Sequence, residues 1–112
     1  MVKQGDIIWL DFDPQKGHEQ KGRRPALVVS NNSFNKLTGN KMIMICPITN
    51  TNKGFPLHIK LDRMSKVTGV VMCEQVKVLD IQSRNYEKFA ELPSELLDEV
   101  LDIISSISSK ED

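Results

Sequence analysis

Alternating apolar and polar positions predict strands along most of this chain. In residues 6–12, Ile8, Leu10 and Phe12 fall on one side of a pleat, and Asp13-Pro14 ends the segment. Further strands are expected at 25–30, 41–48, 57–61 and 86–89, with one long strand, or two joined at a bend, at 70–79.

Three polar segments separate these strands and are expected to be loops. Residues 14–24 contain two glycines and no apolar residue, which is typical of a surface loop that carries function. Residues 31–40 read as a polar connector that ends in a Gly39-Asn40 turn, and residues 49–54 form another polar loop.

The period changes after Pro93. Apolar residues then recur at the three-to-four spacing of one helical face: Leu96, Leu97, Val100, Leu101, Ile103, Ile104 and Ile107. We expect a helix from Ser94, as its N-cap, to about Ser108. Several short strands and one closing helix favour a mainly β fold, a small antiparallel barrel or sandwich covered by the helix, in a single domain of residues 1–112.

Composition excludes several classes of protein. With 112 residues, 39% hydrophobic and 27% charged, the chain is an ordinary globular domain. Its longest apolar run, residues 42–46, is far shorter than the roughly 20 residues of a membrane span. No secretory signal is visible, so a cytoplasmic protein is expected. Cys46 and Cys73 form no CxxC pair or Cys/His cluster, so neither a metal nor another cofactor is expected.

The formal charge of zero conceals an uneven distribution. Residues 1–60 hold nine basic and four acidic residues, a charge of +5, whereas residues 61–112 hold six and eleven, a charge of −5. Such asymmetry hints at a surface for polyanions, although charge that serves only solubility remains the alternative.

Two loops contain candidate chemistry. Residues 17–24 have the glycine spacing of a phosphate-binding loop but lack its Lys-Ser/Thr ending and the helix that follows it. They do concentrate possible proton carriers and cations: His18, Glu19, Lys21, Arg23 and Arg24. Thr49 places a hydroxyl at a strand end, followed by Asn50. A solvated charged loop and a turn-forming threonine are the plainer readings.

Other side chains have weaker signals. His58 alternates with Leu57 and Ile59, so it is expected to face solvent or a neighbouring strand. Trp9 and Phe55 could stack on bases, but packing in a core or an interface is the commoner use of such residues.

The order of motifs resembles the MazF/PemK (Kid) family of toxin endoribonucleases. The resemblance rests on four blocks along the chain: Gly5-Asp-Ile-Ile-Trp-Leu-Asp-Phe-Asp-Pro14; Gly17-His-Glu-Gln-Lys-Gly-Arg-Arg-Pro25; Pro47-Ile-Thr49 with Lys53-Gly-Phe-Pro56; and Gly69-Val-Val with Glu74-Gln-Val-Lys77. The residues of the first two blocks resemble the MazF branch of the family most closely.

This resemblance implies a small SH3-like, CcdB/PemK-type barrel, a homodimer, and metal-independent cleavage of single-stranded RNA. It maps active-site positions onto Arg24 and Thr49, and positions linked to cleavage or RNA contact onto Glu19 and Lys53. The position of His18 varies between branches. An Arg/Asp pair of the PemK branch has no clear counterpart here.

The implied chemistry matches the candidate residues. Attack by a neighbouring 2′-OH would give a 2′,3′-cyclic phosphate and a 5′-OH end, and it needs a proton carrier and cationic donors at the phosphate. Arg24 suits the phosphate, Thr49 can donate to another oxygen, and Glu19 is the expected proton carrier. The side chains expected to bind RNA are Lys53, Arg23, Lys21, His18 and Asn50.

Two other function classes stay open at this point. A noncatalytic nucleic-acid-binding β-barrel would use the same basic half of the chain, and a CcdB-like gyrase poison would share the fold without needing Arg24 or Thr49. For a ribonuclease toxin, the expected partner is a cognate antitoxin, acidic and partly disordered when free.

Overall fold

The computed structural model describes residues 1–12, 22–51, 54–61 and 66–112 of the chain. Along these residues the elements run β1 (Asp6–Asp11), β2 (Arg23–Val28), α1 (Asn32–Leu37), β3 (Met42–Thr49), β4 (His58–Lys60), β5 (Val70–Met72), the 3-10 helix η3 (Cys73–Gln75), β6 (Lys77–Asp80), β7 (Glu87–Glu91) and α2 (Ser94–Ser108).

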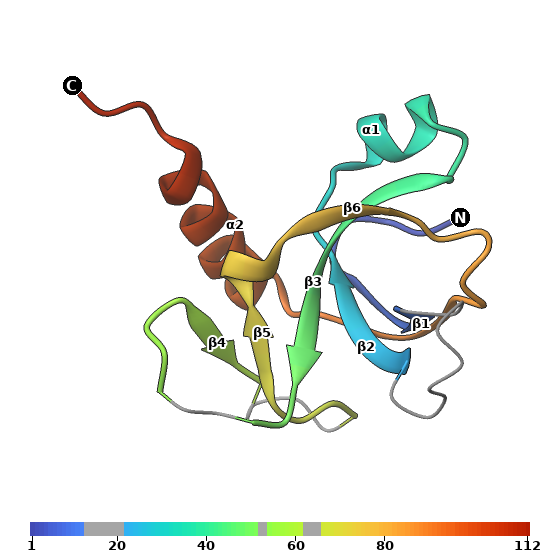
Figure 1. Cartoon of the computed structure of the whole chain (residues 1–112), viewed down its shortest axis with the longest axis horizontal. Coiled ribbons are helices and arrows are strands. Elements are labelled where there is room, and N and C mark those ends of the chain that lie inside the picture. The colour runs from blue at the N-terminus through green and yellow to red at the C-terminus, as the bar shows by residue number, and fades with distance from the viewer. Residues whose placement is uncertain (13–21, 52–53, 62–65) are drawn as a thin grey trace.

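The strands form one antiparallel sheet in the order β4-β5-β3-β2-β1-β7, and β6 pairs with β3 beside β5. The expected class, mainly β with a C-terminal helix, is confirmed (Figure 1). Within the described residues β4 and β7 end the path without pairing to each other, so the sheet is open and a barrel only in a loose sense.

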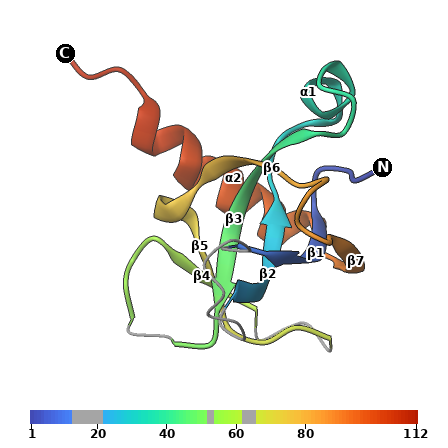
Figure 2. The same cartoon turned by 45° about the vertical axis from the view of Figure 1, so that its right-hand side comes forward.

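Strand β1 is buried on both faces because it separates two apolar cores. Ile7 belongs to the core that also contains Leu96 and Val100 of α2, whereas Ile8 and Leu10 belong to the other. Adjacent residues of a strand point to opposite faces, so one strand can serve both cores. Figures 1 and 2 both place α2 at the β4–β5 end of the sheet, against the first core.

Helix α2 covers the expected residues, but its N-cap differs from the prediction. Pro93, with ψ of 147°, is the cap, and Ser94 is already helical without a capping side-chain bond. The carbonyl of Pro93 accepts from Leu97 N at 3.0 Å, so it starts the helical ladder itself. No helix in the described part of the chain is both long and apolar enough to cross a membrane.

The polar connector 31–40 contains the short helix α1, which its composition did not predict. Asn31 Oδ1 accepts from Phe34 N at 2.8 Å as an N-cap, and Asn35 is fully buried, where its amide donates to Ser30 O at 3.2 Å. The turn at Gly39-Asn40 is confirmed, since both residues have positive φ. Residues 70–79 form two strands joined at η3, the second of the two expected arrangements.

Candidate active site

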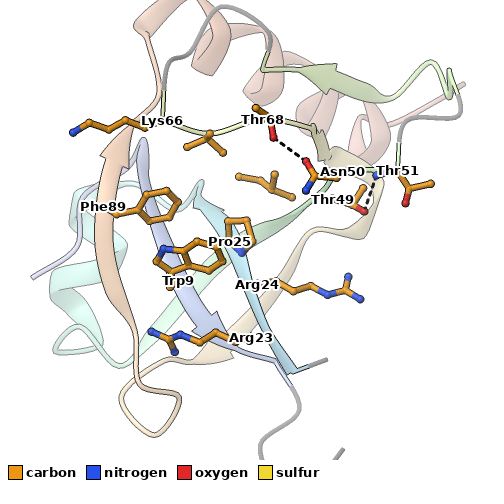
Figure 3. A pocket seen from close by; sticks show the side chains of 12 residues that line it. Trp9, Arg23, Arg24, Pro25, Thr49, Asn50, Thr51, Lys66, Thr68 and Phe89 are labelled. Atoms are coloured by element: carbon orange, nitrogen blue, oxygen red, sulfur yellow. Dashed lines mark hydrogen bonds between the residues drawn. The ribbon is translucent and has the colours of Figure 1, made fainter. Parts of the chain in front are cut away.

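A cavity of about 470 Å³ lies where β2 begins and β3 ends. Its lining consists of Trp9, Arg23, Arg24, Pro25, Ile48, Thr49, Asn50, Thr51, Lys66, Val67, Thr68 and Phe89 (Figure 3). These residues come from five separate stretches of sequence that the fold brings together. A strand edge with polar loops is a common place for a binding site.

Arg24 and Thr49 line the same cavity. Strand β2 pairs with β3 from Ala26 opposite Pro47 onward, so Arg24 lies two residues before this paired stretch and Thr49 two residues after it. Both side chains therefore come from the end of the β2–β3 pair where the cavity lies (Figure 3). Arg24 is exposed, and no ion pair joins it to any other residue that the structure describes. Its guanidinium is therefore positioned to meet an anion beside the threonine hydroxyl.

Arg23 points to the other face of β2, opposite in direction to Arg24 (Figure 3). Its guanidinium donates to Asp11 Oδ1 at 3.1 Å and to Asn85 O at 2.9 Å, and lies 3.7 Å from Glu87 Oε1. Hydrogen bonds from Asn85 and Arg23 hold the pKa of Asp11 below its usual value. Arg23 thus lines the cavity while its charge is already matched by carboxylates.

The loop after β3 is held in shape by short contacts. Thr49 Oγ1 accepts from Thr51 N at 3.2 Å, which leaves the Thr49 O–H as a donor. Thr68 Oγ1 donates to Asn50 Oδ1 at 2.9 Å. Gly69, at φ +106°, packs so closely that an added Cβ would lie 2.3 Å from Thr49 O. A side chain at position 69 would therefore displace the backbone that presents the Thr49 hydroxyl.

The opposite wall of the cavity is aromatic. The rings of Trp9 and Phe89 stack with centroids 5.0 Å apart and an interplanar angle of 19°, and Pro25 lies beside Trp9 (Figure 3). Exposed Lys66 adds a positive charge above this wall. The cavity thus combines cations and hydroxyls on one side with flat apolar surface on the other.

The structure brings together four of the sequence-predicted site residues: Arg24, Thr49, Arg23 and Asn50. The other four, His18, Glu19, Lys21 and Lys53, lie outside the described residues. Sequence reasoning did not select Thr51, Lys66, Thr68 or Phe89. Thr51 stood in the polar loop already noted, and Thr68 directly precedes the Gly69 motif, whereas Lys66 and Phe89 had no local signal.

The two cysteines are not candidates for nucleophilic chemistry. Both are buried, and burial raises the pKa of Cys46 to about 12 and that of Cys73 to about 11. Among the described residues no three His, Cys, Asp or Glu side chains gather as metal ligands.

Comparison with known proteins matches the sequence to one family. Residues 3–108 match the family model described as PemK-like, MazF-like toxin of type II toxin-antitoxin system. The chain is 42% identical over 84 residues to the endoribonuclease toxin MazF of Escherichia coli (strain K12), covering 75% of this chain and 73% of that protein.

Solved structures agree in fold. A crystal structure of MazF from Deinococcus radiodurans superposes with a TM-score of 0.80 at 42% identity, covering 95% of this chain and 94% of the other. A crystal structure of MazE-MazF from the same organism superposes with a TM-score of 0.79 at 36% identity, covering 95% and 93%.

Proposed function

The chain belongs to the PemK-like, MazF-like toxin family of type II toxin-antitoxin systems, and we propose that it is a toxin endoribonuclease that cuts single-stranded RNA at the cavity between β2 and β3. Family membership confirms the resemblance seen in the sequence motifs. The relatives named endoribonucleases, MazF of Escherichia coli among them, support the activity.

One observation carries the proposal for this site: Arg24 and Thr49, far apart in sequence, line the same cavity at the end of the β2–β3 pair. Arg24 lacks a carboxylate partner among the described residues, while its neighbour Arg23 has two. An arginine without a carboxylate partner, in a cavity that also contains a threonine hydroxyl, is available to bind an anion such as a phosphate.

The proposed reaction is attack of a ribose 2′-oxygen on the adjacent phosphorus. The new O–P bond forms as the bond to the 5′-oxygen breaks, leaving a 2′,3′-cyclic phosphate and a 5′-OH end. Arg24 donates its two parallel N–H groups to the phosphoryl oxygens, whose negative charge grows in the transition state. Thr49 donates its O–H to the same phosphate.

Protons must also leave the 2′-OH and reach the departing 5′-oxygen. We assign this proton transfer to Glu19. The residues that we expect to contact RNA are Lys53, Lys21, His18 and Asn50. Arg23 has a lesser role because carboxylates already neutralise its charge. Single-stranded RNA is the proposed substrate because unpaired bases expose edges that the deep, narrow major groove of duplex RNA hides from side chains.

Partners are proposed on the same basis. A crystal structure of MazE-MazF is similar to this chain over 95% of its length, which supports a cognate antitoxin as a partner. We propose that this antitoxin is acidic and partly disordered when free. We also propose a homodimer in the cytoplasm. A dimer predicts a mass near twice 12.7 kDa by light scattering at micromolar concentration, and a monomer mass would contradict it.

Incubation of the purified protein with a mixed-sequence single-stranded RNA tests the proposed reaction. We expect cleavage at a short sequence, in EDTA as well as without it, with 5′-OH ends at the products. A 2′-deoxy substitution at the cut nucleotide should block cleavage there. Normal cutting of that deoxy substrate would contradict attack by the 2′-OH.

The same gel separates the alternatives. RNA that is bound but left intact indicates a noncatalytic binding domain. RNA that is neither bound nor cut, together with inhibition of gyrase, indicates a CcdB-like poison.

A further inference from the structure

A second cavity, of about 590 Å³, adjoins the candidate active site. Its lining consists of Thr49, Thr51, Gly54, Phe55, Pro56, His58, Met72 and Glu74. Thr49 and Thr51 line both cavities, so one short loop separates them. A nucleotide held at Thr49 therefore has this second cavity next to it, and the volume lies within the range of small-ligand pockets.

The walls of the second cavity are suited to a flat apolar ligand. Phe55, Pro56 and Met72 are the large apolar side chains of its lining. Phe55 is 45% exposed and is the one aromatic residue among the exposed large hydrophobic side chains of the described chain. Leaving such a ring in water is unfavourable, and nucleic-acid-binding proteins use exposed rings to stack on bases.

A histidine–glutamate pair is the polar group of this cavity. His58 on β4 bonds through Nε2 to Oε2 of Glu74 on η3 at 3.0 Å, with side chains only 11% and 24% exposed. His58 thus faces a neighbouring segment, one of the two placements expected from its alternation. Its ring packs edge to face against the Phe55 ring, with the ring centroids 5.1 Å apart. Among the described residues, neither Nδ1 of His58 nor Oε1 of Glu74 has a hydrogen-bond partner, and both are covered.

The unpartnered oxygen of Glu74 is a hydrogen-bond acceptor. Burial acts to raise the pKa of Glu74, but hydrogen bonds from His58 and the backbone outweigh it and lower the pKa below its ordinary value. An ionised carboxylate can only accept, so Nε2 of His58 donates to Oε2 of Glu74, and Oε1 is left as an acceptor without a donor among the described residues. A buried acceptor without a donor is costly, which points to a ligand that brings N–H groups.

We propose that the second cavity is a nucleobase pocket that reads one base beside the cleaved phosphate, with Phe55 stacking on the base and the His58–Glu74 pair accepting from its exocyclic amino group. This assignment rests on the proposed RNA cleavage. In the structure the Phe55 ring lies against the imidazole, so the proposal requires this ring to turn aside for a base to reach the pair. Adenine, cytosine and guanine carry an amino group, whereas uracil presents a single N–H between two carbonyl oxygens, so uracil is disfavoured at this position.

The test compares the cleavage preferences of variants on a random-sequence RNA pool, read by sequencing the product ends. Phe55→Leu removes the stacking ring, and Glu74→Gln changes one acceptor into a donor without changing the shape of the side chain. The matched controls are Leu37→Ala on α1 and Glu99→Gln on α2, both exposed and away from the two cavities. Thermal midpoints and circular dichroism verify that each variant folds.

We expect Phe55→Leu to lower cleavage of the preferred sequence about tenfold or more. Glu74→Gln should reduce the discrimination against uracil at one position about tenfold and leave the other positions unchanged. The controls should match wild type. Unchanged preferences in both folded variants would overturn the assignment, as would variants that lose antitoxin affinity while keeping the wild-type preference.

A binding arm separates this inference from the proposed function. Oligonucleotides made non-cleavable by 2′-deoxy substitution carry an abasic site at each position in turn, and their affinities are measured for wild type and Phe55→Leu. At one position, removal of the base should weaken binding to wild type but leave the affinity of Phe55→Leu unchanged. If wild type binds RNA but does not cleave it, the proposed reaction is wrong, and the binding measurements still test the nucleobase pocket. Equal dependence on the base at every position in wild type and Phe55→Leu would refute the pocket.

Discussion

At the scale of single residues, Arg23 and Arg24 show how a strand divides two adjacent charges. The alternation of β2 directs Arg23 to Asp11, Asn85 and Glu87, whereas Arg24 points the other way and lines the cavity with Thr49 (Figure 3). Partners far away in sequence hold Arg23, while no ion pair joins Arg24 to another described residue. Two substitutions that look alike in sequence should therefore have different consequences.

Arg24→Ala should abolish cleavage while leaving the fold intact. Loss of one donor to the transition state costs on the order of 10²-fold or more in rate, and an exposed side chain contributes little to the core. Arg23→Ala is the matched comparison, expected to lower the thermal midpoint more and the rate less. Rates on one RNA and thermal midpoints of both variants check this. Equal rates for the two variants would remove the distinction between the arginines.

The thiols of Cys46 and Cys73 should resist alkylation in the folded protein. Burial raises both pKa values, to about 12 and about 11, so both groups stay protonated at pH 8 and only the thiolate reacts. Iodoacetamide followed by mass spectrometry should find no adduct on native protein within a time that fully labels protein in denaturant. Rapid labelling of native Cys46 would show that the core around it opens readily.

At the scale of elements, the candidate site residues lie at the ends of strands, and the loop after β3 packs against Gly69, the residue directly before β5. Gly69 and Gly39 both have positive φ, but only at Gly69 would a Cβ meet backbone, 2.3 Å from Thr49 O; at Gly39 nothing lies within 4 Å. Alanine substitution at Gly39 therefore tests backbone strain alone, whereas alanine substitution at Gly69 also displaces the backbone of the site.

Gly69→Ala should reduce cleavage strongly and destabilise the fold, because the Thr49 backbone has to move. Gly39→Ala should cost only about 1 kcal/mol, for a side chain in left-handed backbone, and leave the rate unchanged. Urea unfolding and single-turnover cleavage measure the two effects. A Gly69→Ala variant that cuts RNA at the wild-type rate would show that the loop position is not critical.

The elements that sequence predicted well are those whose pattern is local. The alternation of Ile8, Leu10 and Phe12 and the spacing of Leu96 and Val100 follow directly from facing a core. Helix α1 escaped prediction because a buried Asn35 bonded to Ser30 stabilises it, and polar composition alone suggested a loop. Arg24 and Thr49 were singled out by motif, but only the folded chain shows that they line one cavity.

At the scale of the whole molecule, an antitoxin segment that covers the cavity is the expected control. An acidic, extended segment could match the charge of Arg24 and the exposed Lys66 where RNA phosphates would otherwise lie. Titration with the cognate antitoxin should suppress cleavage stoichiometrically and displace a non-cleavable RNA analogue. Simultaneous binding of both, without competition, would mean that inhibition acts by rearranging loops instead.

The loop of Thr49 and Thr51, which lines both cavities, also limits how such a toxin can evolve. Any change in these two residues alters turnover and base choice together, so selection for a new target sequence would meet a loss of rate there. Phe55, Pro56, His58, Met72 and Glu74 line the second cavity and not the first. Diversification of the cleaved sequence should therefore accumulate at those residues, while the shared threonines drift slowly.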